Sequence, residues 1–181
     1  MWISGITNHE NFEIDEMYWF KGKKAKKETR ENIYLIALVS REPRQIVGFS
    51  VATDKSPERI QQIIDTAPEA KHYFTDGYLG YIDVVYPGLH IRNVRDKKDT
   101  HFIESVNADI RHYLPIFARK SRCFPREIDT AEAVVAVFAD AYNKFGEAKL
   151  KYRVPTVHKS SNPSKHLHKY QDLPFSHLDF L

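Results

Sequence analysis

Cysteine is almost absent from this 181-residue chain, in which Cys123 is the only one. A single cysteine excludes an internal disulfide and the zinc modules that need two or more cysteine ligands. The chain also lacks an apolar run of about 18 residues, so we expect no transmembrane helix and no membrane partner. Residues 1–5 lack the basic and apolar regions of a secretory signal. These absences favour a reducing, intracellular setting, and we expect a cytoplasmic protein.

What is present is the composition of a folded domain. Hydrophobic residues make up 42% of the chain and charged residues 28%, which is typical of a soluble globular protein rather than a disordered one. The length suits one mixed α/β core, which we place at residues 1–150. Residues 151–181 include several prolines and show little periodicity, and we expect them to form a basic, loosely packed C-terminal tail.

The formal net charge of +3 says little by itself, but the lysines and arginines gather in clusters. Basic clusters bind phosphate backbones and release counterions. Any one of them is equally consistent with a solvated turn or helix end. Three such clusters near candidate acidic residues favour a nucleic-acid partner. The clusters are Lys21, Lys23, Lys24, Lys26, Lys27 and Arg30; Arg92, Arg95, Lys97 and Lys98; and Arg119, Lys120, Arg122 and Arg126.

Hydrophobic patterns predict five strands, at 12–20, 33–39, 46–52, 72–75 and 89–94. Short connections make the first three strands an antiparallel meander. The segment 78–86 is ambiguous between a loop and a short helix.

Three helices are also predicted. The first begins with Ser56 as its N-cap and Pro57 at its first position. The second begins near residue 100 and is interrupted at Pro115. The third spans about 129–145, and its expected apolar face consists of Val134, Val137, Phe138, Ala141 and Tyr142.

This order of elements predicts an α/β protein with a mixed five-stranded sheet, an antiparallel three-strand meander and flanking helices. The order matches the ribonuclease H-like fold. A fold alone does not establish a function.

Three carboxylates lie where this order can bring them together. Asp15 is in the first strand, Asp76 closes the fourth beside Gly77, and Glu104 lies one turn into the second helix. If the first and fourth strands are neighbours, the carboxylates meet at one edge of the sheet. Such a set suits two Mg²⁺ ions for phosphodiester chemistry. An Asp-Gly dipeptide is more often only a turn, so the residues alone also leave a structural role open.

The second helix carries a polar stripe at steps of three, three and four: His101, Glu104, Asn107 and Arg111. Asn107 could hold a phosphate or a ligand water, and Arg111 could bind a phosphate in bidentate fashion. A solvent-facing helix side would show the same spacing.

Three stretches resemble the transposases of insertion sequence 1 type elements, over about residues 12–145. The first is Asp-Glu-Met-Tyr-Trp-Phe at 15–20, followed by a glycine-lysine turn. The second is Thr-Asp-Gly-Tyr at 75–78, followed by Tyr81 and Leu89-His90. The third is His-Phe-Ile-Glu-Ser-Val-Asn at 101–107, followed by Ile110-Arg111, Ala118-Arg119-Lys120-Ser121, Phe124 and the helix to Tyr142-Asn143.

The resemblance implies a DDE transposase that cleaves and transfers DNA strands, with Asp15, Asp76 and Glu104 as the catalytic triad that binds Mg²⁺ or Mn²⁺. Ser105 stands where an arginine is common and His101 where glutamine is expected, which leaves the details of DNA contact open. Residues expected to support the site or contact DNA, from the resemblance or from the basic clusters, are Lys23, Lys24, Lys26, Lys97, Lys98, Asn107, Arg111, Arg119 and Lys120.

The resemblance also implies partners. These are the DNA of the element ends and of the target, and further copies of the chain, at least a dimer, in the synaptic complex. Such transposases carry an N-terminal zinc-binding and helix-turn-helix region, which we expect to be encoded upstream. The expected location is the nucleoid of a prokaryotic cytoplasm. Two alternatives remain: a ribonuclease H-like nuclease without joining activity, and an inactive DNA-binding remnant of a transposase.

Overall fold

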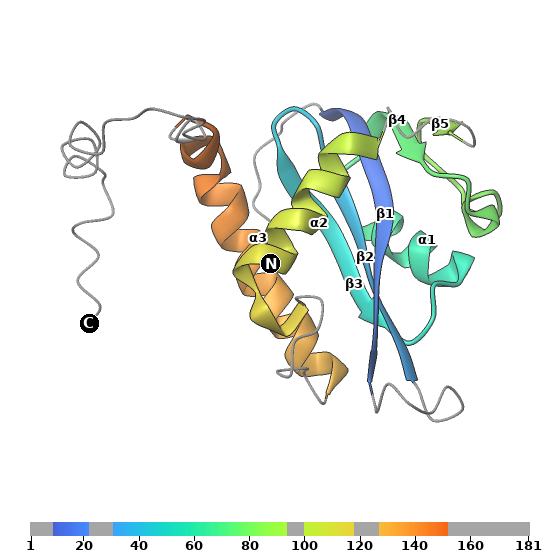
Figure 1. Cartoon of the computed structure of the whole chain (residues 1–181). Coiled ribbons are helices and arrows are strands. Elements are labelled where there is room, and N and C mark those ends of the chain that lie inside the picture. Colours follow the sequence, from blue (N-terminus) through green and yellow to red (C-terminus); the bar gives the residue numbers. More distant parts are fainter. Residues whose placement is uncertain (1–8, 22–30, 94–99, 118–126, 152–181) are drawn as a thin grey trace, which may run out of the picture.

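The computed structural model describes residues 9–21, 31–93, 100–117 and 127–151 (Figure 1). Its five strands are β1 (His9–Lys21), β2 (Glu31–Ser40), β3 (Gln45–Ala52), β4 (Ala70–Thr75) and β5 (Leu89–Arg92). The described residues also form α1 (Pro57–Thr66), α2 (His101–Tyr113) and α3 (Ile128–Lys151), with short 3₁₀ helices at Leu79–Tyr81 and Pro115–Phe117. The predicted order of elements is confirmed, and the ambiguous segment 78–86 contains the first of the 3₁₀ helices.

The strands form one sheet in the order β3-β2-β1-β4-β5. β1, β2 and β3 pair antiparallel, as the predicted meander requires. β4 pairs parallel with β1 on one side and with β5 on the other. The sheet is therefore mixed, and the first and fourth strands are neighbours, which is the condition under which we expect the carboxylates to meet.

Side-chain alternation along the central strands divides the core into two layers. Leu35, Ala37 and Val39 of β2 pack with the apolar residues of α2 and α3. Ile36 and Leu38 of the same strand pack with α1 on the opposite face. In Figure 1, α1 covers one face of the sheet, and α2 and α3 cover the other. β2 is buried on both faces because it lies between these layers.

Local sequence explains where α1 begins and where α2 ends. The Ser56 hydroxyl accepts a hydrogen bond from the backbone N–H of Arg59 at 3.4 Å, and Pro57 occupies the first helical position, as predicted. α2 ends at Tyr113, just before Pro115, where a 3₁₀ turn replaces the α-helix. The predicted interruption at Pro115 is confirmed.

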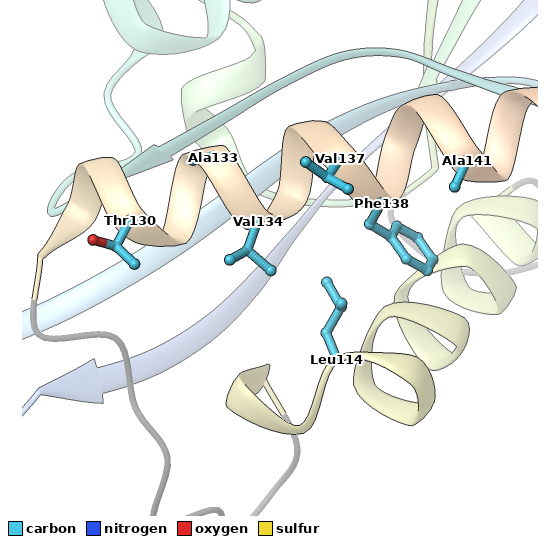
Figure 2. A pocket seen from close by; sticks show the side chains of 7 residues that line it. All are labelled: Leu114, Thr130, Ala133, Val134, Val137, Phe138 and Ala141. Atoms are coloured by element: carbon cyan, nitrogen blue, oxygen red, sulfur yellow. The ribbon is translucent and has the colours of Figure 1, made fainter. Parts of the chain in front are cut away.

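The predicted apolar face of α3 is partly wrong. Tyr142 is buried as expected, but Val137 is 73% exposed, and the buried side of the helix consists of Ala131, Val135, Ala139 and Tyr142. Val137 instead helps to line a shallow apolar hollow of about 400 Å³ beside Leu114 (Figure 2). α3 is apolar on more than one side, so its periodicity could not select the side that packs on the sheet.

A polar contact fixes α3 against β3, which is at the edge of the sheet. The Asn143 side chain accepts from the backbone N–H of Ile46 at 2.8 Å and donates to its carbonyl at 2.9 Å. This amide therefore satisfies both backbone groups of one edge residue. Among the helices of the described ranges, none combines the length and apolarity needed to cross a bilayer.

Candidate metal centre

Strand β1 carries three carboxylates close together, Glu13, Asp15 and Glu16. Because side chains alternate along a strand, Glu13 and Asp15 share the face toward α2, where Met17 also packs. Glu16 lies on the α1 face, like Phe12 and Ile14. The three groups have very different surroundings.

Glu13 is fully buried and fully paired. Its Oε1 accepts from Nε of Arg41 at 2.7 Å, and its Oε2 accepts from the backbone N–H of Ile103 at 2.8 Å. The Arg41 guanidinium also lies 3.9 Å from the centre of the Phe74 ring. Thr100, the N-cap residue of α2, makes no side-chain capping bond. Glu13 therefore caps α2 from the sheet and fixes the start of that helix over β1.

Asp15, two residues further along the same face, has no such compensation. Its Oδ2 accepts from Nδ2 of Asn107 at 3.0 Å, and within the described residues no basic side chain forms an ion pair with it. Burial, then the negative charges of Glu16, Asp76 and Glu104, raise the pKa of Asp15 to about 7. The charges of the other two predicted carboxylates, Asp76 and Glu104, therefore both act on Asp15.

Asp76 reaches Asp15 through the strand register. Ile14 of β1 pairs with Thr75 of β4, so the next step along both parallel strands sets Asp15 beside Asp76. The Asp76 Oδ1 accepts from the backbone N–H of Tyr78 at 2.8 Å, which turns the chain away from the sheet. Nη2 of Arg92, at the end of β5, donates to the carbonyl of Gly77 and holds this turn from the other side.

Glu104 acts on Asp15 from α2 through its charge. It is exposed in the first turn of the helix, directly after Ile103, whose N–H is bound by Glu13. The docking of α2 on β1 thus sets the position of Glu104 relative to Asp15.

Asn107 lies one turn along α2 from Glu104 and is 3% exposed. Its Nδ2 binds Asp15, whereas its Oδ1 is buried and has no hydrogen-bond partner among the described residues. A buried amide oxygen without a partner is costly, which makes it suited to a ligand, water or ion at this place. Arg111 follows one turn later and is half-buried.

The donor set fits a hard divalent cation, because carboxylate and amide oxygens are what Mg²⁺ and Mn²⁺ prefer. The un-neutralised Asp15 and the unpartnered Asn107 Oδ1 are observations of this structure that favour such an ion. In the ranges that the structure describes, however, no three His, Cys, Asp or Glu side chains are already arranged to hold a metal. Glu104 is exposed, and exposed side chains change rotamer within nanoseconds.

The remaining predicted site residues lie outside the described ranges. The predicted DNA contacts of Lys23, Lys24, Lys26, Lys97, Lys98, Arg119 and Lys120 therefore stay predictions, as does the tail beyond Lys151. Among the described residues, sequence reasoning missed the Glu13–Arg41 pair. The only available signal was the alternation of side chains along a strand, which places Glu13 and Asp15 on the same face.

Comparison with known protein families gives no matching family, and comparison with curated proteins gives no similar sequence.

Proposed function

We propose that this chain is the catalytic domain of a DNA transposase of the insertion sequence 1 type, built on a ribonuclease H-like core. The sheet order β3-β2-β1-β4-β5 with helices on both faces is compatible with that fold. The proposed activity is metal-dependent cleavage of DNA followed by strand transfer.

A single observation carries the proposal: Asp15 is largely buried, lacks a cationic partner among the described residues, and faces the charges of Asp76 and Glu104. Three acids that repel one another at one edge of a sheet are unfavourable for stability unless a cation joins them. The neighbouring Glu13 shows that this protein can neutralise a buried carboxylate with arginine. Among the described residues no arginine or lysine pairs with Asp15, which favours a site for divalent ions there.

The proposed roles follow from position. Asp15, Asp76 and Glu104 bind the ions through their carboxylate oxygens, and Asn107 holds the orientation of Asp15. Arg111, further along the same helix, binds a DNA phosphate. Two divalent ions, when bound, activate the attacking oxygen and stabilise the leaving oxygen.

The proposed reaction has two steps, and in each step one bond to phosphorus forms and one breaks. In cleavage, a water oxygen bonds to phosphorus, the bond from phosphorus to the 3′ oxygen breaks, and a 3′-hydroxyl is released. In transfer, that hydroxyl loses its proton and its oxygen bonds to a target phosphorus. The target 3′ oxygen leaves and takes up a proton. Both displacements use the same carboxylates, so one site serves both steps.

The test compares Asp15→Asn, Asp76→Asn and Glu104→Gln with Glu10→Gln as a matched control. Glu10 lies on the same strand but is exposed and paired with Lys71. Each variant is incubated with Mn²⁺, labelled duplex DNA bearing a 3′-hydroxyl, and supercoiled plasmid. We expect joining to fall at least about 100-fold in the three site variants and to be unchanged in the control.

Wild-type-like joining by all three site variants would refute the proposal. Metal-dependent hydrolysis without joining would instead support the nuclease alternative. Circular dichroism of each variant separates loss of chemistry from loss of fold.

A further inference from the structure

A second polar cluster lies directly behind the candidate metal centre, on the α1 face of β1. Glu16 follows Asp15, so the two side chains point to opposite faces of the strand. The Glu16 Oε1 forms an ion pair with Nζ of Lys55, and its Oε2 accepts from the Tyr81 hydroxyl at 2.8 Å. The Glu16 side chain is 11% exposed and Tyr81 is fully buried. The cluster is therefore built into the interior of the protein.

Tyr78 extends this cluster to Asp76. The backbone N–H of Tyr78 donates to Oδ1 of Asp76 at 2.8 Å, and its hydroxyl donates to the carbonyl of Lys55 at 3.2 Å. Nζ of Lys55 lies 3.8 Å from the centre of the Tyr78 ring. Tyr78 and Tyr81 pack edge to face, with their ring centres 5.6 Å apart. The segment 76–81 is thus held at its middle by Lys55 and at its end by Glu16.

Tyr81 and Lys55 both keep the protons that their contacts with Glu16 need. Burial, then the charge of Glu16, raises the pKa of Tyr81 well above its ordinary value, so the hydroxyl stays a donor. Burial lowers the pKa of Lys55, but the hydrogen bond and charge of Glu16 outweigh it and the net shift is upward. Lys55 therefore stays cationic.

We propose that Glu16 and Tyr81 are positioning residues for Asp76: they fix the 76–81 segment so that the Asp76 carboxylate stays beside Asp15. This inference rests on the proposed function, in which the two aspartates share divalent ions. Glu16 lies on the face of β1 opposite to Asp15 and binds Tyr81 there, so both residues act on Asp76 through the 76–81 segment. Groups that orient a metal ligand typically change metal affinity about 10- to 100-fold when they are removed.

The test compares Tyr81→Phe with Tyr73→Phe. Tyr73 is an equally buried tyrosine of the same core layer, but its hydroxyl contacts the backbone of Ala70 rather than Glu16. Mn²⁺ binding is measured directly by electron paramagnetic resonance, and the Mn²⁺ concentration for half-maximal DNA cleavage is measured in parallel. We expect Tyr81→Phe to weaken both about 10-fold, with little change in the rate at saturating Mn²⁺, and Tyr73→Phe to match the wild type.

Tyr78→Phe gives a graded second variant, because it removes only the hydroxyl that reaches Lys55 and keeps the N–H that binds Asp76. We expect a change in the same direction but smaller. Unchanged Mn²⁺ affinity in Tyr81→Phe, with wild-type activity established, overturns the positioning role and leaves the proposed function intact. Equal weakening in Tyr73→Phe also overturns it, because the effect would then be general to the core. Absence of Mn²⁺ binding by the wild type overturns the proposed function and this inference together.

Discussion

Glu13 and Asp15 lie two positions apart on the same face of the same strand, yet their surroundings are opposite. Glu13 is completely buried and receives Arg41 and the N–H of Ile103. Among the described residues Asp15 receives neutral donors, the Asn107 amide and the backbone of Glu16, and it faces other carboxylates. The first arrangement stabilises the fold by docking α2 on the sheet. The second costs stability in the metal-free protein and is typical of a functional site.

The comparison shows that burial and residue type do not separate a structural carboxylate from a functional one. What separates them is compensation by the surroundings. Three experiments test this contrast, from the largest expected effect to the smallest.

The first removes the compensation of Glu13. In Arg41→Ala the Glu13 carboxylate stays buried without its cation, and we expect the free energy of unfolding to fall by about 3 kcal/mol. Urea unfolding followed by circular dichroism measures the change. Lys71→Ala is the control, because it breaks the exposed Glu10–Lys71 pair between β1 and β4 and should leave the urea midpoint unchanged. Equal losses of unfolding free energy in the two variants would show that the buried Glu13–Arg41 pair stabilises the protein no more than the exposed Glu10–Lys71 pair does.

The second experiment removes the charge of Asp15. The raised pKa of about 7 means that the folded protein binds the proton more tightly than the unfolded chain does. Between about pH 4 and pH 7 the folded state holds the extra proton, so rising pH should destabilise the wild type relative to Asp15→Asn. We expect Asp15→Asn to be more stable by about 2 kcal/mol at pH 8 in EDTA, with the difference vanishing near pH 4. This is about half of what the full pKa shift would give, because Asp15 is not completely buried and solvent screens part of the effect.

The measurement is urea unfolding of both proteins at several pH values. A difference that does not depend on pH would show that Asp15 is ionised normally, and the contrast with Glu13 would then be lost. Loss of strand joining in the same variant would link the stability cost to function.

The third experiment supplies compensation to Asp15 from outside. If divalent ions neutralise the Asp15 carboxylate as Arg41 neutralises that of Glu13, Mn²⁺ should stabilise the wild type by about 1.4 kcal/mol at ten times its dissociation constant. Thermal melts with Mn²⁺ or EDTA measure the shift. Glu10→Gln should respond like the wild type, and Asp15→Asn should respond weakly. An equal shift in Asp15→Asn would place the ion elsewhere in the protein.

Much of the fold could be predicted because its signals are local. Ser56 and Pro57 mark the start of α1, Pro115 ends α2, and the apolar run of β2 indicates a strand buried on both faces. The pairing of β1 with β4, needed to bring Asp15 to Asp76, stays only a condition at the level of the sequence, and the structure fulfils it. The packing side of α3 was partly wrong, because Val137 belongs to a second apolar side that periodicity cannot distinguish from the first.

The sequence by itself determined the elements, their order and the three acids that the motifs single out, because caps, breakers and alternation act between residues near each other in the chain. Only the tertiary structure decided what each acid of β1 meets. Arg41, Ile103 and Asn107 approach that strand from distant positions, and no spacing rule relates them to Glu13 or Asp15. A carboxylate becomes a support or a candidate ligand through such long-range neighbours, because they set whether its charge is neutralised within the fold.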